Sequence, residues 1–73
     1  MLTTEELLKL KIDELPFSDG LKMILVDQKI ACFGDVLNLP IKVWMEWEGF
    51  DFHCLKQIID FIKKKGLINY LRH

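Results

Sequence analysis

A turn that leads into a helix brings together the residues of this chain that could do chemistry. The stretch EGFDFHCLKQ, residues 48–57, contains a glycine, an aspartate and the adjacent pair His53 and Cys54. A thiol beside an imidazole is the raw material of a nucleophilic pair, and the same two side chains can bind a metal. A turn that opens into a helix also presents free backbone N–H groups at the positive end of the helix dipole, where many proteins hold phosphate.

Geometry argues against catalysis by the His53 and Cys54 pair. Adjacent side chains on a helix point about 100° apart, so the imidazole and the thiol do not face each other. A metal site would also need Cys32 and His73 to converge on them. We therefore expect no catalytic residues, no metal and no cofactor, so that the chain is not an enzyme. Both cysteines are expected to be small buried core residues and His53 to lie on the surface.

The phosphate hypothesis depends on the charges around the turn. Asp51 is a good N-cap for the following helix, because its carboxylate can accept a hydrogen bond from a backbone N–H in the first turn. It would fill the anion site with the protein's own negative charge. Phe52 and His53 supply no fixed positive charge near neutral pH. The pattern favours a structural cap over a phosphate site in the hairpin turn of Gly49, Phe50, Asp51 and His53.

Size and composition set the class of protein. The 73 residues are enough for one small domain, and the 51% of hydrophobic residues can supply its core. A formal net charge of -1 gives no overall field that would attract DNA or an anionic membrane. The chain shows neither a signal-peptide pattern nor an apolar stretch of about 18 residues. We therefore expect a soluble, cytoplasmic protein that binds no membrane and no small-molecule substrate.

Helical periods separated by strong breakers predict an all-α domain, a compact bundle of four to five short helices. Thr3 and Glu6 have the spacing of a capping box, and Leu2 can pack on Leu7 as a hydrophobic staple. Ser18 can cap the second helix after the break at a proline. The expected helices cover residues 4–11, 19–28, 32–39, 40–47 and 52–65.

The end of the last helix carries its own stop signal. Three lysines, Lys63, Lys64 and Lys65, stand beside the negative end of the helix dipole and are followed by Gly66. If this glycine is the C′ residue, the next leucine can pack on Ile62 in a Schellman motif. We expect the tail, residues 68–73, to pack only in part.

The order of elements and their apolar spacing resemble a known domain. The matching segments are IDEL.FS, I..FGDVLNL and GF....L..I..FIKKKGL. From Ile12 to Leu67 the chain resembles, without gaps, the C-terminal domain of the bacterial RNA polymerase alpha subunit. The resemblance implies a helical core at residues 12–67 that ends in a helix-hairpin-helix, preceded by an N-terminal helix extension at residues 1–11. In that family the domain binds AT-rich promoter DNA in the minor groove and contacts transcription activators.

The chain departs from this family at the positions that contact DNA. The family typically has arginine at position 20, asparagine at 23 and 49, glycine at 51, lysine at 52 and 53, and serine at 54. The residues found there in this chain are Gly20, Met23, Gly49, Asp51, Phe52, His53 and Cys54. The framework is kept, in Ile12, Leu15, Ile30, Gly34, Asp35, Leu37, Phe50, Leu55, Ile58, Gly66 and Leu67. The resemblance therefore implies a kept scaffold with a replaced DNA-reading surface.

Apolar residues in the fourth helix suggest a different surface. Trp44 belongs to one face of this helix, while Val43 and Trp47 fall on another, and one short helix cannot bury both faces. Phe52 follows shortly after. Either Val43, Trp47 and Phe52 contact a protein partner, or the first two pack locally under the N-terminal helix.

Two functions remain open at this point. The favoured one is a noncatalytic protein-interaction module, associated with transcription, whose partner is RNA polymerase, a transcription factor or a second copy of the chain. The alternative is a DNA-binding domain that contacts backbone phosphates with little base readout. Its contacts would be Lys56, Lys63, Lys64 and Lys65, although lysines in a last turn are also expected from the helix dipole alone.

Overall fold

The computed structural model describes residues 3–70, which form five α-helices and two short 3-10 helices and no strand. The predicted all-α fold is confirmed over this range. Leu2, the predicted staple residue, and His73, a possible metal ligand, lie outside the described residues. The α-helices are α1 (Thr4–Leu8), α2 (Asp19–Asp27), α3 (Phe33–Leu37), α4 (Ile41–Glu46) and α5 (Phe52–Lys64). The 3-10 helices are η1 (Ile12–Glu14) and η2 (Ile68–Tyr70).

The first helix is shorter than predicted, because α1 ends at Leu8 and not near residue 11. The chain after it is held extended by two contacts with a distant segment. The backbone N–H of Phe33 donates to the carbonyl of Leu10 at 2.9 Å, and Lys11 forms an isolated bridge with Cys32. Only the start of the predicted helix followed local rules, with the Thr3 capping box present.

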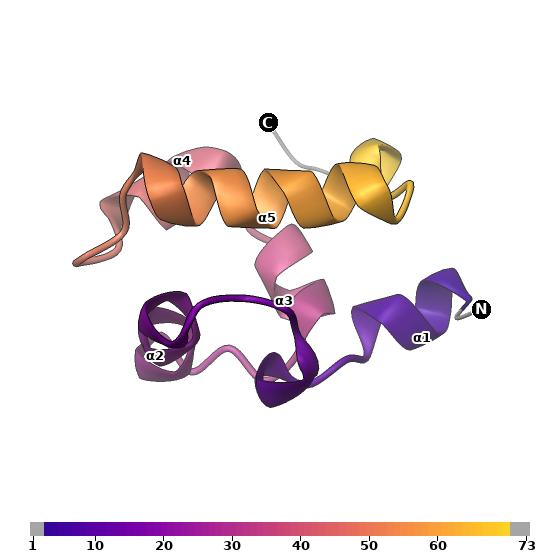
Figure 1. Ribbon diagram of the computed structural model, residues 1–73, viewed down its shortest axis with the longest axis horizontal. Coiled ribbons are helices and arrows are strands. Elements are labelled where there is room, and N and C mark those ends of the chain that lie inside the picture. The colour runs from indigo at the N-terminus through magenta and orange to yellow at the C-terminus, as the bar shows by residue number, and fades with distance from the viewer. Residues whose placement is uncertain (1–2, 71–73) are drawn as a thin grey trace.

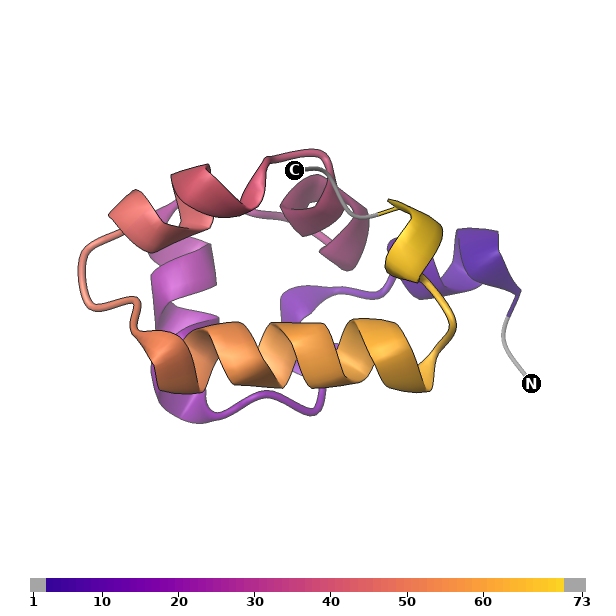
Figure 2. The same cartoon turned by 90° about the horizontal axis from the view of Figure 1, so that it is seen from above.

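Helices α4 and α5 run in roughly opposite directions and are joined by residues 47–51 (Figure 1). Helix α2 lies across this hairpin near its connected end, about perpendicular to α5 (Figure 2). Helix α1 lies toward the opposite end of the long axis and packs against α3. Gly34 permits this approach, since a β-carbon there would stand 3.0 Å from the carbonyl oxygen of Leu8.

Three phenylalanine rings from different segments of the chain pack together in the core. The Phe33 ring lies 4.8 Å from that of Phe61 on α5 and 6.2 Å from that of Phe17, which precedes α2. Trp44 is fully buried, and its indole Nε1 donates to the carbonyl of Val36 at 3.0 Å. No polar or charged residue between residues 3 and 70 is buried, so the interior is held by apolar packing.

Helix α5 ends as the sequence predicts. Gly66 has φ +70°, and its N–H donates to the carbonyl of Lys63 at 3.2 Å. The N–H of Leu67 donates to the carbonyl of Ile62 at 2.9 Å, which completes the Schellman motif. Leu67 and Ile62 are both buried, so the two side chains that were predicted to pack on each other both belong to the core.

A side chain from α5 holds the start of α2. The Ser18 hydroxyl accepts the N–H of Leu21 at 3.4 Å, which confirms Ser18 as the N-cap. Gln57 on α5 contacts Ser18 twice: its Oε1 accepts the Ser18 N–H at 2.7 Å, and its Nε2 donates to the Ser18 hydroxyl at 3.2 Å. The N-terminal end of α2 is therefore tied to α5 by a polar clasp between residues 39 apart in sequence.

The other end of α2 contains a backbone position that suits glycine better than the residue present. Lys29 has φ 61°, and its N–H donates to the carbonyl of Val26 at 2.9 Å. The next N–H, of Ile30, donates to the carbonyl of Leu25 at 3.0 Å, so this is a second Schellman motif, with lysine at C′. The left-handed conformation costs a residue with a β-carbon roughly 1–2 kcal/mol.

We expect Lys29→Gly to raise the free energy of unfolding by about 0.5–1 kcal/mol. The gain is smaller than the strain relieved, because glycine has more backbone freedom to lose on folding, roughly 0.5–1 kcal/mol. Urea denaturation followed by circular dichroism measures the change. Lys29→Ala is the matched control, since it removes the charge but keeps the β-carbon, and it should leave the stability near that of the wild type.

Candidate functional site

The hairpin turn is built by its own backbone and by aromatic packing. Gly49 has φ +83°, a conformation that favours glycine or asparagine. The rings of Trp47 and Phe50 meet edge to face with centroids 5.8 Å apart, and both residues are buried. The buried aromatic pair therefore anchors the turn to the core and so sets the position of the first turn of α5.

Asp51 caps α5 as predicted. Its carboxylate Oδ1 accepts the backbone N–H of Cys54 at 3.0 Å. This hydrogen bond holds the pKa of Asp51 below its ordinary value, with a smaller contribution from the neighbouring His53. The carboxylate therefore stays ionised near neutral pH and places a negative charge at the N-terminal end of α5, where it accepts a hydrogen bond from a backbone N–H that could otherwise face an anion.

This cap makes a prediction about acid. Because the folded pKa of Asp51 is lowered, its stabilising effect is present above the unfolded pKa of about 3.9 and is lost as the pH falls through the folded value below it. Asp51→Asn keeps a capping oxygen that does not titrate. Thermal melts at several pH values should show the wild-type melting temperature falling more steeply than that of Asp51→Asn below about pH 4. Parallel curves would contradict this role of the carboxylate.

The neighbouring His53 and Cys54 lie in different surroundings. His53 is exposed, whereas Cys54 is buried, and burial raises the pKa of its thiol. A thiol of raised pKa is a poor source of thiolate, the nucleophilic form. No group of three or more potential metal ligands occurs within residues 3–70. Cys54 lies in the core as expected, whereas the expectation that Cys32 is also a buried core residue is wrong, since Cys32 is only partly buried.

The four candidate DNA-contacting lysines, which are Lys56, Lys63, Lys64 and Lys65, are all exposed. Lys56 lies one turn before Asp60 and Lys64 one turn after it, so an exposed carboxylate stands between them on the same face of α5. The Lys65 ammonium lies 5.9 Å from the centre of the Phe61 ring. A basic surface therefore exists only at the C-terminal end of the helix.

The prediction that Val43, Trp47 and Phe52 form one exposed interaction surface is wrong. Trp47 is only 8% exposed and belongs to the core, and Val43 is partly buried against the same core. Helix α4 ends at Glu46, and Trp47 adopts an extended backbone, with ψ 136°, that leaves the helix. The helical periodicity used to place Trp47 outside therefore does not apply to it. Phe52 alone of the three is freely exposed, at 76%.

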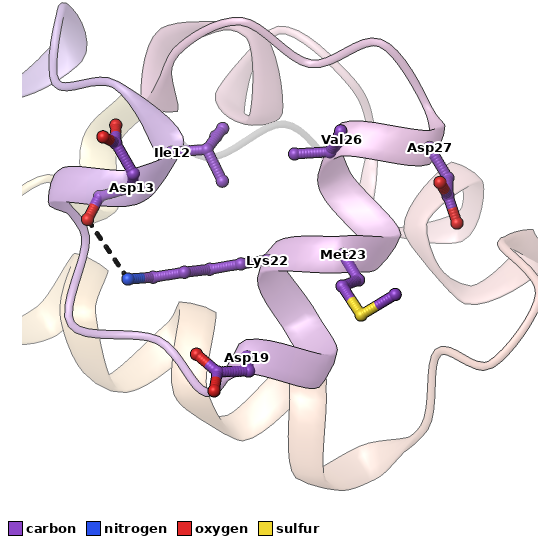
Figure 3. A pocket seen from close by; sticks show the side chains of 7 residues that line it. All are labelled: Ile12, Asp13, Asp19, Lys22, Met23, Val26 and Asp27. Carbon is purple, nitrogen blue, oxygen red and sulfur yellow. Dashed lines mark hydrogen bonds between the residues drawn. The ribbon is translucent and has the colours of Figure 1, made fainter.

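A different apolar surface lies on α2 and was not identified from the sequence. Met23 is 66% and Val26 61% exposed. They line an open groove of about 480 Å³ between α2 and η1, where Val26 points toward Ile12 (Figure 3). Two apolar residues three positions apart, outside the buried stripe of α2, were the available signal.

We call this pocket the α2 groove. Charged residues line it as well as the apolar ones. Three of its seven lining residues are aspartates, Asp13, Asp19 and Asp27. The lining contains one cation, Lys22, whose Nζ donates to the backbone carbonyl of Asp13 at 3.2 Å (Figure 3). The groove therefore combines an apolar floor with a mainly acidic rim, which suits a basic and apolar partner better than a nucleic acid.

The chain shows no significant match to a family model, to a curated protein or to a solved structure. The similarity to the RNA polymerase alpha C-terminal domain therefore stays a prediction made from the residues quoted above. Among the described helices the longest, α5, has 13 residues, and none is long and apolar enough to cross a membrane.

Proposed function

We propose that the chain is a noncatalytic protein-interaction module, and that its partner belongs to the transcription machinery, as the resemblance implies. One observation carries the proposal: apolar side chains are exposed at positions where the family carries polar or cationic DNA contacts. Met23, where the family typically has asparagine, is 66% exposed. Phe52, where the family typically has lysine, is 76% exposed. Exposed apolar side chains of this size favour protein contacts over phosphate contacts.

Electrostatics support the same choice. Asp51 places an ionised carboxylate at the start of α5, and the α2 groove adds three more carboxylates. Phosphate approaching this side of the molecule meets repulsion rather than a cradle of N–H groups. The exposed lysines at the end of α5 are the remaining support for the DNA alternative.

Binding assays with RNA polymerase subunits and with an AT-rich duplex, run in parallel on the immobilised chain, test the proposal. We expect a polymerase subunit to bind and Met23→Asp or Phe52→Asp to weaken it at least about tenfold, since each change puts a charge into an apolar contact. Asn38→Asp, a charge change at another exposed site, is the control. Submicromolar, sequence-dependent binding of the duplex at physiological salt would favour the DNA alternative instead.

Restoring the family's DNA contacts gives a second test. We expect wild-type affinity for the duplex to be weaker than about 10⁻⁵ M at physiological salt. The triple variant Gly20→Arg, Asp51→Gly, His53→Lys should bind more tightly, because it removes the carboxylate and adds two cations. Space is available for the arginine, since no atom lies within 4 Å of a β-carbon built at Gly20. If the triple variant folds but gains no affinity, the repulsion by Asp51 is not what prevents DNA binding.

A further inference from the structure

The α2 groove has a complementary surface on the same chain. The exposed Lys63 and Lys64 end α5, the exposed Lys65 is its C-cap, and η2 begins three residues later at Ile68. In η2, Ile68 is 48% and Tyr70 50% exposed. We call this surface the basic end. It combines three exposed lysines with two exposed apolar residues in one short segment, residues 63–70, whereas the lining of the α2 groove combines two exposed apolar residues with three aspartates and Lys22.

These two surfaces lie apart within one molecule. Helix α2 is toward one end of the long axis, and the last turn of α5 with η2 is toward the other, in both views of the fold (Figures 1 and 2). The long axis measures 33 Å. The groove and the basic end of one copy therefore cannot meet each other, whereas those of two copies can.

We propose that the α2 groove of one copy receives the basic end of a second copy, in a head-to-tail contact. The inference deepens the proposed protein-interaction function and rests on it, by naming an occupant of the groove. Opposite charges on the two surfaces favour this pairing over groove-to-groove contact, where like-charged rims would face each other. The net charge of -1 leaves little general repulsion between copies.

Head-to-tail contact joins two different surfaces, so each added copy leaves one free groove and one free basic end. Such a contact grows into chains unless it closes into a ring. Because each surface offers only two exposed apolar side chains, we expect a dissociation constant of about 10⁻⁴ M. Salt should weaken the contact, since surface charges separated by more than about 8 Å are screened at physiological ionic strength.

Sedimentation velocity on the whole chain tests the contact. The groove variant is Asp13→Lys with Asp27→Lys, and the basic-end variant is Lys63→Glu with Lys64→Glu. Each reverses two exposed charges. The matched control is Glu46→Lys with Glu48→Lys, which makes the same change in net charge as the groove variant at exposed residues outside the groove. Thermal melts establish that every variant is folded.

We expect the wild type and the control to sediment faster as the concentration rises from about 10 μM to about 1 mM at low salt, with the increase lost in about 0.5 M salt. Each charge-reversal variant alone should stay monomeric. Within each variant the two surfaces carry charge of the same sign, so neither variant pairs with itself. The groove variant keeps its basic end but cannot accept another, so mixing it with the wild type should shorten the assemblies by capping them. Rescue is expected when the reversed groove meets the reversed basic end, which the equimolar mixture of both variants supplies.

A wild type that stays monomeric at about 1 mM and low salt would overturn head-to-tail contact. So would self-association that neither salt nor either variant reduces, or a mixture of the two variants that stays monomeric. Binding of a polymerase subunit, measured separately, keeps the two proposals distinct. A monomeric chain that still binds the subunit loses only this inference, and a self-associating chain that binds none loses only the transcription partner.

Discussion

Trp47→Ala is expected to lower the free energy of unfolding by about 3–5 kcal/mol, the usual cost of truncating a core tryptophan. Trp47 is 8% exposed, and its ring meets Phe50 edge to face inside the hairpin turn. A domain of this size has a total stability of roughly 4–11 kcal/mol, from about 0.05–0.15 kcal/mol per residue. The variant should therefore be largely unfolded or melt far below the wild type, as measured by circular dichroism.

The exposed Phe52 provides the control for Trp47. It is 76% exposed and lies only five positions further along the chain. Phe52→Ala should change the free energy of unfolding by no more than about 0.5 kcal/mol, as is usual for surface substitutions. A Trp47→Ala variant that melts like the wild type but loses binding to a partner would show that Trp47 acts at an interface after all.

Phe33→Ala should be as destabilising, by about 3–5 kcal/mol. The Phe33 side chain is fully buried, and its ring contacts those of Phe17 and Phe61 from two other segments. Its loss would leave a cavity where α3, α5 and the segment before α2 meet, and short helices cannot collapse into it without breaking their other contacts. Urea denaturation measures the loss, with the slope of the transition showing whether the remaining core stays compact.

Phe33→Leu separates the filled volume from the aromatic ring contacts at the same site. It keeps an apolar side chain of similar size, so we expect it to cost about 1.5 kcal/mol or less. The difference between leucine and alanine then reports the cavity. If both variants lose the same stability, the edge-to-face ring contacts and not the filled volume would be the main contribution of Phe33.

The ends of α5 could be predicted because caps depend on residues a few positions apart. Asp51 accepts the N–H of Cys54 as expected, and Gly66 adopts the positive φ that a helix stop requires. Such local rules involve only the backbone groups of one turn. Lys29 shows their limit, since it takes the same left-handed position as Gly66 although nothing in its residue type predicts it.

Contacts between distant segments account for what could not be predicted. The chain around Lys11 is extended because it bridges to Cys32, which no helical period near residue 11 reveals. Trp47 is buried because the backbone leaves the helix at that residue, whereas the sequence pattern assumed that the helix continued. The α2 groove depends on where η1 comes to lie beside Met23 and Val26, so only the exposed residue pair, not the groove, was accessible from sequence.

The clasp between Gln57 and Ser18 has a consequence for the order in which the chain can fold and open. Its two hydrogen bonds join residues 39 apart, so they form only after α5 has docked. Until then the first turn of α2 lacks these two hydrogen bonds. The whole helix has only nine residues and is too short to be stable alone. Opening of α5 and fraying of α2 are therefore coupled in one cooperative unit, and the Ser18 amide proton should exchange with solvent only as fast as α5 departs.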